Sequence, residues 1–201
     1  MALKNEKIKR HEKLTALMEQ NPLYTDEDLA RLLNVSLSTI RLDRAQLGVP
    51  ELRKRMRQMA ERAVSRLRSL KQEEFIGELL GLEPNVWALS ILQTTREMAF
   101  RHTQQICDQY IYAQASTLAI AVIEADLVVV TSFRGRYGAP AMVGERLVAR
   151  AKVGVNEGDK YIVSVHTTVD DKEIYVGRFI VRALTSPSYE QETATAAGGS
   201  R

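Results

Sequence analysis

The segment at roughly residues 102–123 most constrains the fold, because its second half has helical spacing but no polar face. A helix that is apolar all round must be buried within the protein. The apolar run at 118–123 is far shorter than the roughly 20 residues that cross a bilayer, so no membrane span is expected. The apolar positions are Ala113, Ala115, Leu118, Ala119, Ile120, Ala121 and Val122. Because several of them are alanines, the helix can approach a sheet closely.

The residues after this helix are expected to form an antiparallel sheet around it. The stretches LVVVTSFRGRY, ERLVARAKV, KYIVSVHTTV and EIYVGRFIVRAL are β-branched or alternating, and DDKE has the composition of a turn. Two shorter strands are expected earlier, at 77–82 and 87–95. One buried helix flanked by strands predicts an α+β layer. It resembles a hot-dog fold, a sheet curled around a central helix, and GERLVARAKV resembles the third-strand region of hot-dog thioesterases and dehydratases.

The first third of the chain has a different pattern, that of a helix-turn-helix. After a helix expected at 3–20, Thr25 and Ser36 can each cap a further helix. Asn34 stands at the turn between them, where a left-handed backbone is tolerated. This spacing is typical of a helix-turn-helix, with a purely structural helical hairpin as the alternative. Residues 1–72 carry 16 lysines and arginines against nine acids, which favours a polyanionic partner.

The second helix of this unit is expected to leave short hydroxyls and arginines outside the core. Such side chains contact phosphates and base edges. Double-stranded operator DNA is therefore the expected partner, and STIRLDR resembles the recognition helix of DeoR-type bacterial regulators. The residues expected to contact DNA are Ser36, Ser38, Thr39, Arg41, Arg44 and, in the next helix, Arg53.

A connecting amphipathic helix is expected to begin at Pro50. Its apolar residues recur at three- and four-residue steps and form one narrow stripe among many arginines. The stripe must pack either on the sheet domain or on a second copy, and a homodimer suits a helix-turn-helix that binds paired half-sites. The expected domains are 1–49 for DNA binding, 50–72 for the connector, 73–185 for the sheet domain, and a disordered tail at 186–201.

Metal and redox chemistry are not expected. The single cysteine, Cys107, excludes an internal disulfide and a cysteine-based zinc site, and the three scattered histidines lack metal-ligand spacing. No metal and no cofactor are therefore expected. The absence of a secretory signal favours a cytoplasmic location. For Cys107, a small pocket-lining role is favoured over a reactive thiol, because the adjacent Asp108 disfavours a thiolate.

Four phrases of the sequence resemble one bacterial family. They are VSLSTIRLDR, PELRKR, YAQASTLAIAVI and GERLVARAKV, and the resemblance extends over about residues 5–184. The family is FapR, whose members repress genes of fatty-acid and phospholipid synthesis. The resemblance implies a non-enzymatic homodimer that binds a palindromic operator. It also implies that malonyl-CoA, malonyl-carrier protein or a related acyl thioester binds the hot-dog domain and releases the DNA.

The resemblance carries over unevenly to the effector site. Cys107 and Asp108 stand where the family has Arg-Gly, and Ser116 stands where it has Asn. A thiol and a carboxylate cannot bind the malonyl carboxylate as a guanidinium does. The residues expected to bind the effector are Phe100 and Arg136, which match family positions, together with Cys107, Asp108, Ser116 and Arg134.

Several explanations of these substitutions remain open. Arg134 or Arg101 could replace the missing arginine, the effector could lack a free carboxylate, or sensing could be lost and leave a DNA-binding scaffold. The alternative class is an enzyme, since hot-dog thioesterases place a carboxylate near the central helix. Asp108, assisted by His102, could then activate water.

Overall fold

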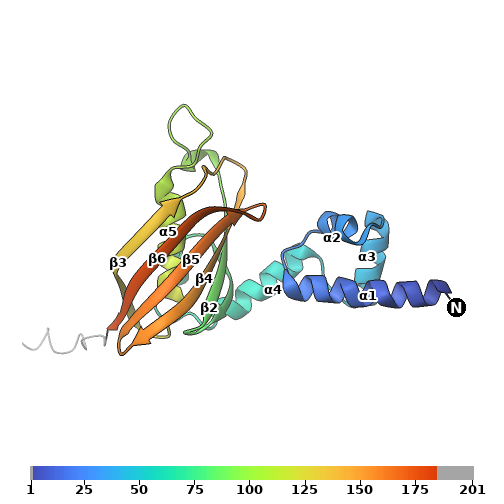
Figure 1. Ribbon diagram of the computed structural model, residues 1–201, viewed down its shortest axis with the longest axis horizontal. Helices are drawn as coiled ribbons and strands as arrows, with labels where there is room; N and C mark the ends of the chain where they lie inside the picture. The colour runs from blue at the N-terminus through green and yellow to red at the C-terminus, as the bar shows by residue number, and fades with distance from the viewer. Residues whose placement is uncertain (1, 185–201) are drawn as a thin grey trace, which may run out of the picture. The chain divides into compact units, whose positions relative to one another are not determined.

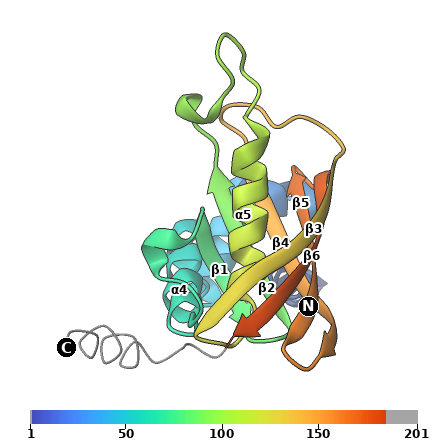
Figure 2. The same ribbon diagram turned by 90° about the vertical axis from the view of Figure 1, so that its left-hand side faces the viewer.

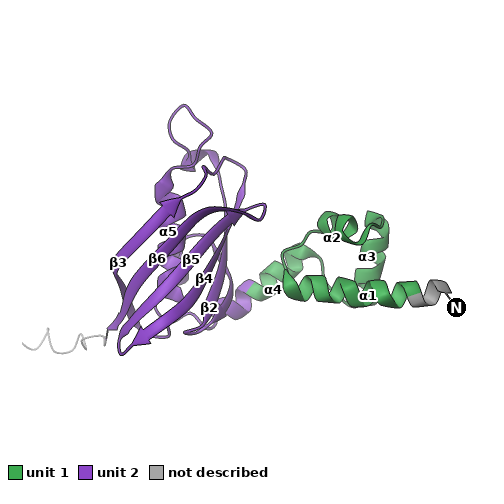
Figure 3. Ribbon diagram, viewed as in Figure 1, with its two compact units in different colours: residues 1–59 green, residues 60–201 purple. Residues whose placement is uncertain are grey.

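The chain forms two compact units in the computed structural model, which describes residues 2–184 (Figure 3). Unit 1 is Met1–Met59 and unit 2 is Ala60–Arg201. The division falls inside the fourth helix. The expected disordered tail at 186–201 lies outside the described residues.

Unit 1 is built from short helices around a small apolar core. Leu14, Leu29 and Ile40, one from each of the first three helices, are fully buried together. Burying each such side chain contributes about 1.5–3 kcal/mol, so these three contacts hold the helices against one another. The elements are α1 (Ala2–Gln20), α2 (Asp26–Leu33), α3 (Leu37–Gln46) and the first part of α4 (Leu52–Val64) (Figure 1).

The turn between α2 and α3 has the geometry that the sequence predicts for a helix-turn-helix. Thr25 and Asp28 form a capping box, in which the Thr25 hydroxyl accepts from the Asp28 N–H and the Asp28 carboxylate accepts from the Thr25 N–H. Asn34 ends α2 in the left-handed conformation, with φ of 51°. Ser36 then caps α3 by accepting from the Thr39 N–H at 3.2 Å. Local sequence therefore determines both helix boundaries.

Unit 2 is a single six-stranded antiparallel sheet with one helix across a face (Figure 2). The strand order is β1-β2-β4-β5-β6-β3, which leaves β1 and β3 at the two edges. Helix α5 (Asp108–Ala121) lies on the inner face of this sheet. The strands are β1 (Glu78–Glu83), β2 (Trp87–Gln93), β3 (Leu127–Tyr137), β4 (Arg146–Glu157), β5 (Lys160–Val169) and β6 (Lys172–Leu184).

The core of unit 2 lies between α5 and the sheet, as the apolar helix requires. Ala115, Leu118 and Ala119 on the helix are fully buried, and Ala149 and Ala151 are buried on β4. The alanines on both surfaces allow the helix to approach closely, which produces the expected hot-dog fold. None of the helices in the described part of the chain is both long and apolar enough to cross a bilayer.

The helix α5 begins at Asp108, six residues later than the sequence suggests. The preceding segment instead folds back on itself: the Cys107 N–H donates to the Met98 carbonyl at 2.9 Å, and the Ile106 N–H donates to the Ala141 carbonyl at 2.8 Å. His102 has a positive φ of 66°, which a continuing right-handed helix excludes. Tertiary hydrogen bonds thus override the local helical pattern.

The connecting helix is also shorter than expected, because α4 ends at Val64 rather than near residue 72. Its last turn tightens, with the Arg66 N–H donating to the Ala63 carbonyl at 3.1 Å. Ala63 is buried in the core of unit 2, and Leu67 and Leu70 pack against that core from irregular chain. The apolar stripe is therefore divided between a helix and an extended segment.

Candidate functional site

Short hydroxyl side chains gather at the N-terminus of α3. The Ser36 hydroxyl lies 2.8 Å from both the Ser38 and the Thr39 hydroxyls. Ser36 and Ser38 are exposed, and Thr39 is half-buried. A helix N-terminus that carries exposed hydroxyls suits an anionic ligand such as a phosphate. The structure thus brings together three of the six residues expected to contact DNA.

Arg44 is placed differently from the expectation, because it is buried rather than outside the core. Only 6% of the residue is exposed. Its guanidinium donates to both Asp26 carboxylate oxygens, at 2.8 and 3.0 Å, and to the Val49 carbonyl at 3.1 Å. Arg44 lies one helical turn beyond Ile40, on the face that packs inward. It therefore joins α3 to α2 from a buried position and does not stand on the exposed surface of α3.

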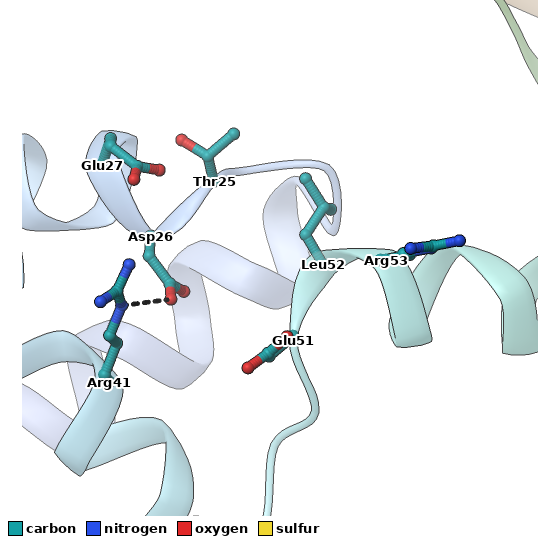
Figure 4. Close-up of a pocket in the computed structure, with 7 residues that line it drawn as sticks. All are labelled: Thr25, Asp26, Glu27, Arg41, Glu51, Leu52 and Arg53. Atoms are coloured by element: carbon teal, nitrogen blue, oxygen red, sulfur yellow. Dashed lines mark ion pairs between the residues drawn. The ribbon is translucent and has the colours of Figure 1, made fainter.

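Arg41 and Arg53 remain exposed and line a cavity of about 390 Å³ in unit 1 (Figure 4). Arg41 lies 3.8 Å from the Asp26 carboxylate, and Arg53 extends away from it. The long Arg41–Asp26 contact is a weak one for an exposed side chain. Arg41 can therefore leave Asp26 to meet a phosphate or a base, at little energetic cost. The other residues lining this cavity are Thr25, Glu27, Glu51 and Leu52.

Asp43 is a buried carboxylate that the sequence analysis did not single out. It is 1% exposed, and it accepts from Arg10 Nε at 2.6 Å and Arg10 Nη2 at 3.2 Å. His11 Nε2 lies 2.9 Å from Asp43 Oδ1, the oxygen that also accepts from Arg10 Nη2. The hydrogen bond from Arg10 holds the pKa of Asp43 below its ordinary value. This network fixes α3 on α1. The sequence feature that could have indicated it was an acidic residue within an otherwise basic recognition helix.

Arg55, in the first part of α4, also has a structural role. Its guanidinium donates to the carbonyl oxygens of Pro50 at 2.9 Å, Tyr24 at 2.8 Å and Pro22 at 3.4 Å. Burial lowers the pKa of Arg55. By satisfying three carbonyls that have no helical partner, Arg55 ties the start of α4 to the loop between α1 and α2.

The second group of expected site residues lies around the N-terminus of α5. Cys107 occupies the capping position, and Asp108 begins the helix. The Tyr137 hydroxyl, at the end of β3, donates to the Asp108 carbonyl at 3.3 Å. Burial, followed by the nearby Asp108 charge, raises the pKa of Tyr137. Tyr137 therefore remains a neutral hydrogen-bonding group at this end of the helix.

Phe100 and Ser116 lie on either side of that helix start. Phe100 is 44% exposed in the folded-back segment, where its N–H donates to the Gln105 carbonyl at 2.9 Å. Ser116 is half-buried on α5, eight residues beyond Asp108, which corresponds to about 12 Å along a helix. The expected residues on α5 thus lie at the helix start, as Cys107 and Asp108, and about two turns further along, as Ser116, with Phe100 in the segment before the helix.

Arg134 and Arg136 lie on the other face of the sheet from α5, which corrects the expectation that they share one site with Cys107. Phe133 faces α5, with its ring centroid 4.6 Å from that of Tyr112, and Tyr137 faces the helix start. Side chains alternate along a strand, so Arg134 and Arg136 project from the opposite, outer face of the sheet. Within one protomer they cannot bind the acyl end of a ligand beside Cys107.

Aromatic side chains on the inner face are the site residues that the sequence analysis missed. The Phe133 ring stacks at 5.9 Å from Phe179, and Tyr137 lies 4.9 Å from Tyr175. Phe133 is 52% exposed although it adjoins this cluster. Together with Tyr112 on α5, these rings form an apolar wall beside the helix. Their four-residue spacing along β3 and along β6, which puts both aromatics of each strand on one face, was the available signal.

Solved structures share the fold of unit 2. Cj0977, a sigma28-regulated virulence protein from Campylobacter jejuni, matches 66% of this chain and 94% of its own at TM-score 0.61 and 24% identity. PH1136, an uncharacterized protein from Pyrococcus horikoshii, matches 60% of this chain and 92% of its own at TM-score 0.56 and 24% identity. These likenesses establish the hot-dog fold. No protein-family model matches the sequence.

Curated relatives match nearly the whole chain. The transcription factor FapR of Thermoanaerobacter sp. strain X514 is 39% identical over 195 residues, covering 97% of this chain and 98% of its own. The FapR proteins of Caldanaerobacter subterraneus and Bacillus cereus strain B4264 are 38% and 36% identical over the same length. The chain belongs to the FapR family. FapR proteins are transcription factors, so the regulatory reading is confirmed over the enzymatic one.

The match to FapR relatives extends over both units of this chain, so it includes the helix-turn-helix with α3 and the hot-dog domain with α5. Among residues 2–184, no group of three or more His, Cys, Asp or Glu side chains is arranged to hold a metal ion.

Proposed function

We propose that this chain is a DNA-binding repressor of fatty-acid and phospholipid synthesis genes, released from its operator by an acyl thioester. The observation that carries the proposal is the match to FapR transcription factors over 97% of the chain. The exposed hydroxyls of α3 and the two exposed arginines of unit 1 support DNA as the ligand of that unit.

The DNA contacts are assigned to the exposed N-terminal part of α3. Ser38 and Thr39 donate to phosphates or base edges, and Arg41 exchanges its long contact with Asp26 for a phosphate or a guanine. Arg53, exposed near the start of α4, adds a phosphate contact. Arg44 is excluded from this set because it is buried and its guanidinium is held by Asp26 and the Val49 carbonyl.

The effector is assigned to the inner face of unit 2, at the N-terminal end of α5. Backbone N–H groups at this end suit the thioester carbonyl oxygen, and the aromatic wall of Phe133 and Tyr137 suits apolar parts of the ligand. Cys107 and Asp108 supply no cation, and Arg134 faces the other way. A malonyl carboxylate therefore lacks the family's arginine at the start of α5, which favours a related acyl thioester with an uncharged acyl end.

A homodimer is part of this proposal. Within the described residues, β3 pairs on one side only, with β6, although it is 11 residues long. A long exposed edge strand is a ready site for pairing with another copy. Pairing of two β3 edges brings a second inner face, with its own aromatic residues, beside the first. Two copies also supply the two helix-turn-helix units that a palindromic operator requires.

The test is operator binding followed by fluorescence anisotropy, using a duplex selected by the protein from a random library. Acetyl-CoA, malonyl-CoA and palmitoyl-CoA are added separately to the complex. Release by acetyl-CoA or palmitoyl-CoA is expected, whereas release by malonyl-CoA alone would assign a carboxylate effector despite Cys107 and Asp108. The sensor proposal would be wrong if the complex persists with every thioester. It would also be wrong if the protein hydrolyses the added thioester.

A further inference from the structure

The outer face of the hot-dog sheet carries a group of cations, which the strand register places together. Figure 1 shows β3, β6, β5 and β4 side by side, with α5 behind them. Across β4, β5, β6 and β3, one row of paired residues is Arg150, His166, Val176 and Arg136. The next row is Lys152, Ser164, Arg178 and Arg134. We call the five exposed cations of these two rows the outer basic face: Arg134, Arg136, Arg150, Lys152 and Arg178.

These cations lie close enough to repel one another. Neighbouring strands are about 4.8 Å apart, and alternate residues on a strand are about 6.8 Å apart. Arg134 and Arg178 are direct partners across β3 and β6. Like charges at directly opposed positions destabilise a sheet. The arrangement is therefore unfavourable in the protein alone, unless an anion meets it.

Within residues 2–184, none of these five side chains takes part in a hydrogen bond or an ion pair. Three other exposed arginines of unit 2 do have acidic partners: Arg66 binds Glu83, Arg68 binds Asp126, and Arg182 binds Asp159. On the outer face, Glu173 is engaged by His166 at 2.7 Å. Because no acid of the described residues binds these five side chains, the outer basic face keeps its positive charge available to a partner.

We propose that the outer basic face binds the phosphate backbone of duplex DNA beside the operator. This inference rests on the proposed DNA-binding function, because unit 1 would deliver the DNA. Covalent linkage of unit 2 to a DNA-bound unit 1 raises the effective concentration of phosphates at the face, so that weak contacts suffice. Four of the five cations are arginines, whose planar guanidinium matches phosphate oxygens. The contacts carry no base specificity and depend strongly on salt.

The test compares the full-length protein on a short operator duplex and on the same operator with long flanks of random sequence. The variant R150Q/K152Q/R178Q removes three charges from the face and leaves Arg134 and Arg136 unchanged. The variant R66Q/R68Q/K71Q is the matched control, because it removes three exposed charges that lie outside the face. Operator affinity is measured at several salt concentrations, and thermal melting checks that each variant is folded.

On the flanked duplex, the face variant is expected to lower the slope of log K against log salt by about 2–3, since each phosphate contact contributes about 0.9. On the short duplex it should bind as the wild type does, and the control should match the wild type on both. Equal slopes for face variant and wild type on the flanked duplex would overturn the inference, as would an equal loss in the control. If the face variant loses binding to polyglutamate but not to flanked DNA, the partner is an acidic protein and the DNA assignment is wrong.

If the triple variant does not fold, R178Q alone is expected to lower the slope on the flanked duplex by about 0.9. An unchanged slope for R178Q would then contradict the inference. Failure of the wild type to bind even the short operator would instead refute the proposed function, which keeps the two outcomes distinguishable.

Discussion

Replacing Arg44 with alanine is expected to lower the free energy of unfolding of unit 1, because Arg44 has a structural role and is not a direct DNA contact. Arg44 makes two charge-assisted hydrogen bonds to Asp26 and one to the Val49 carbonyl, and its side chain is 7% exposed. Removing one partner of a buried ion pair costs about 3–5 kcal/mol. Because the Asp26 side chain keeps 16% exposure and Arg41 lies nearby, the lower end, about 3 kcal/mol, is expected here.

The assay is urea unfolding followed by the helical circular dichroism signal. With a urea dependence of about 1 kcal/mol per molar for so small a unit, the first transition should move down by about 3 M. Arg41→Ala is the matched control, since Arg41 lies on the same helix but its side chain is 61% exposed. Arg41→Ala should change the free energy of unfolding by less than about 0.5 kcal/mol. A wild-type unfolding curve for Arg44→Ala, combined with weakened operator binding, would refute the structural role and restore Arg44 as a DNA contact.

Three further outcomes follow from the site geometry. Arg41→Ala should weaken operator binding by about 1–3 kcal/mol if Arg41 contacts a base, and an unchanged affinity by anisotropy would exclude that contact. Because hydrogen bonding holds the pKa of Asp43 below its ordinary value, Asp43 stabilises the fold above the unfolded-state pKa of about 4 and loses this effect as pH falls through the folded-state value. Asp43→Asn should therefore flatten the acid side of the stability profile measured by thermal melting, and an acid side as steep as that of the wild type would argue against the network. Arg134→Ala should leave effector release of the operator unchanged, whereas Phe133→Ala should weaken it; the reverse result would place the ligand on the outer face.

The helix-turn-helix could be predicted from sequence because its signals are local. Thr25 and Ser36 act as caps within one turn, and Asn34 accepts the left-handed conformation that the turn requires. The burial of Arg44 could not be predicted in the same way. Whether an arginine on a recognition helix faces DNA or a neighbouring helix depends on where the partner acid lies, and Asp26 is 18 residues away.

The faces of β3 could not be assigned from alternation alone, because the strand contains a bulge between Val130 and Ser132. Before the bulge, Val128 and Val130 pack inward; after it, Phe133 and Tyr137 do. One extra residue therefore moves Arg134 and Arg136 to the outer face. The sheet and its central helix were predictable from their composition, but the residues that share the effector site depended on this single irregularity.

Release of the operator by an acyl thioester requires reciprocal coupling between the operator site and the effector site. If an acyl-CoA weakens operator binding by a given factor, saturating operator must weaken binding of that acyl-CoA by the same factor. Calorimetric titration of acetyl-CoA and palmitoyl-CoA into the free protein and into the protein–operator complex measures that factor. Effector binding to the complex is expected to be clearly weaker, by the same fold-change as the loss of operator affinity. Equal effector affinity for the free and operator-bound protein would contradict it.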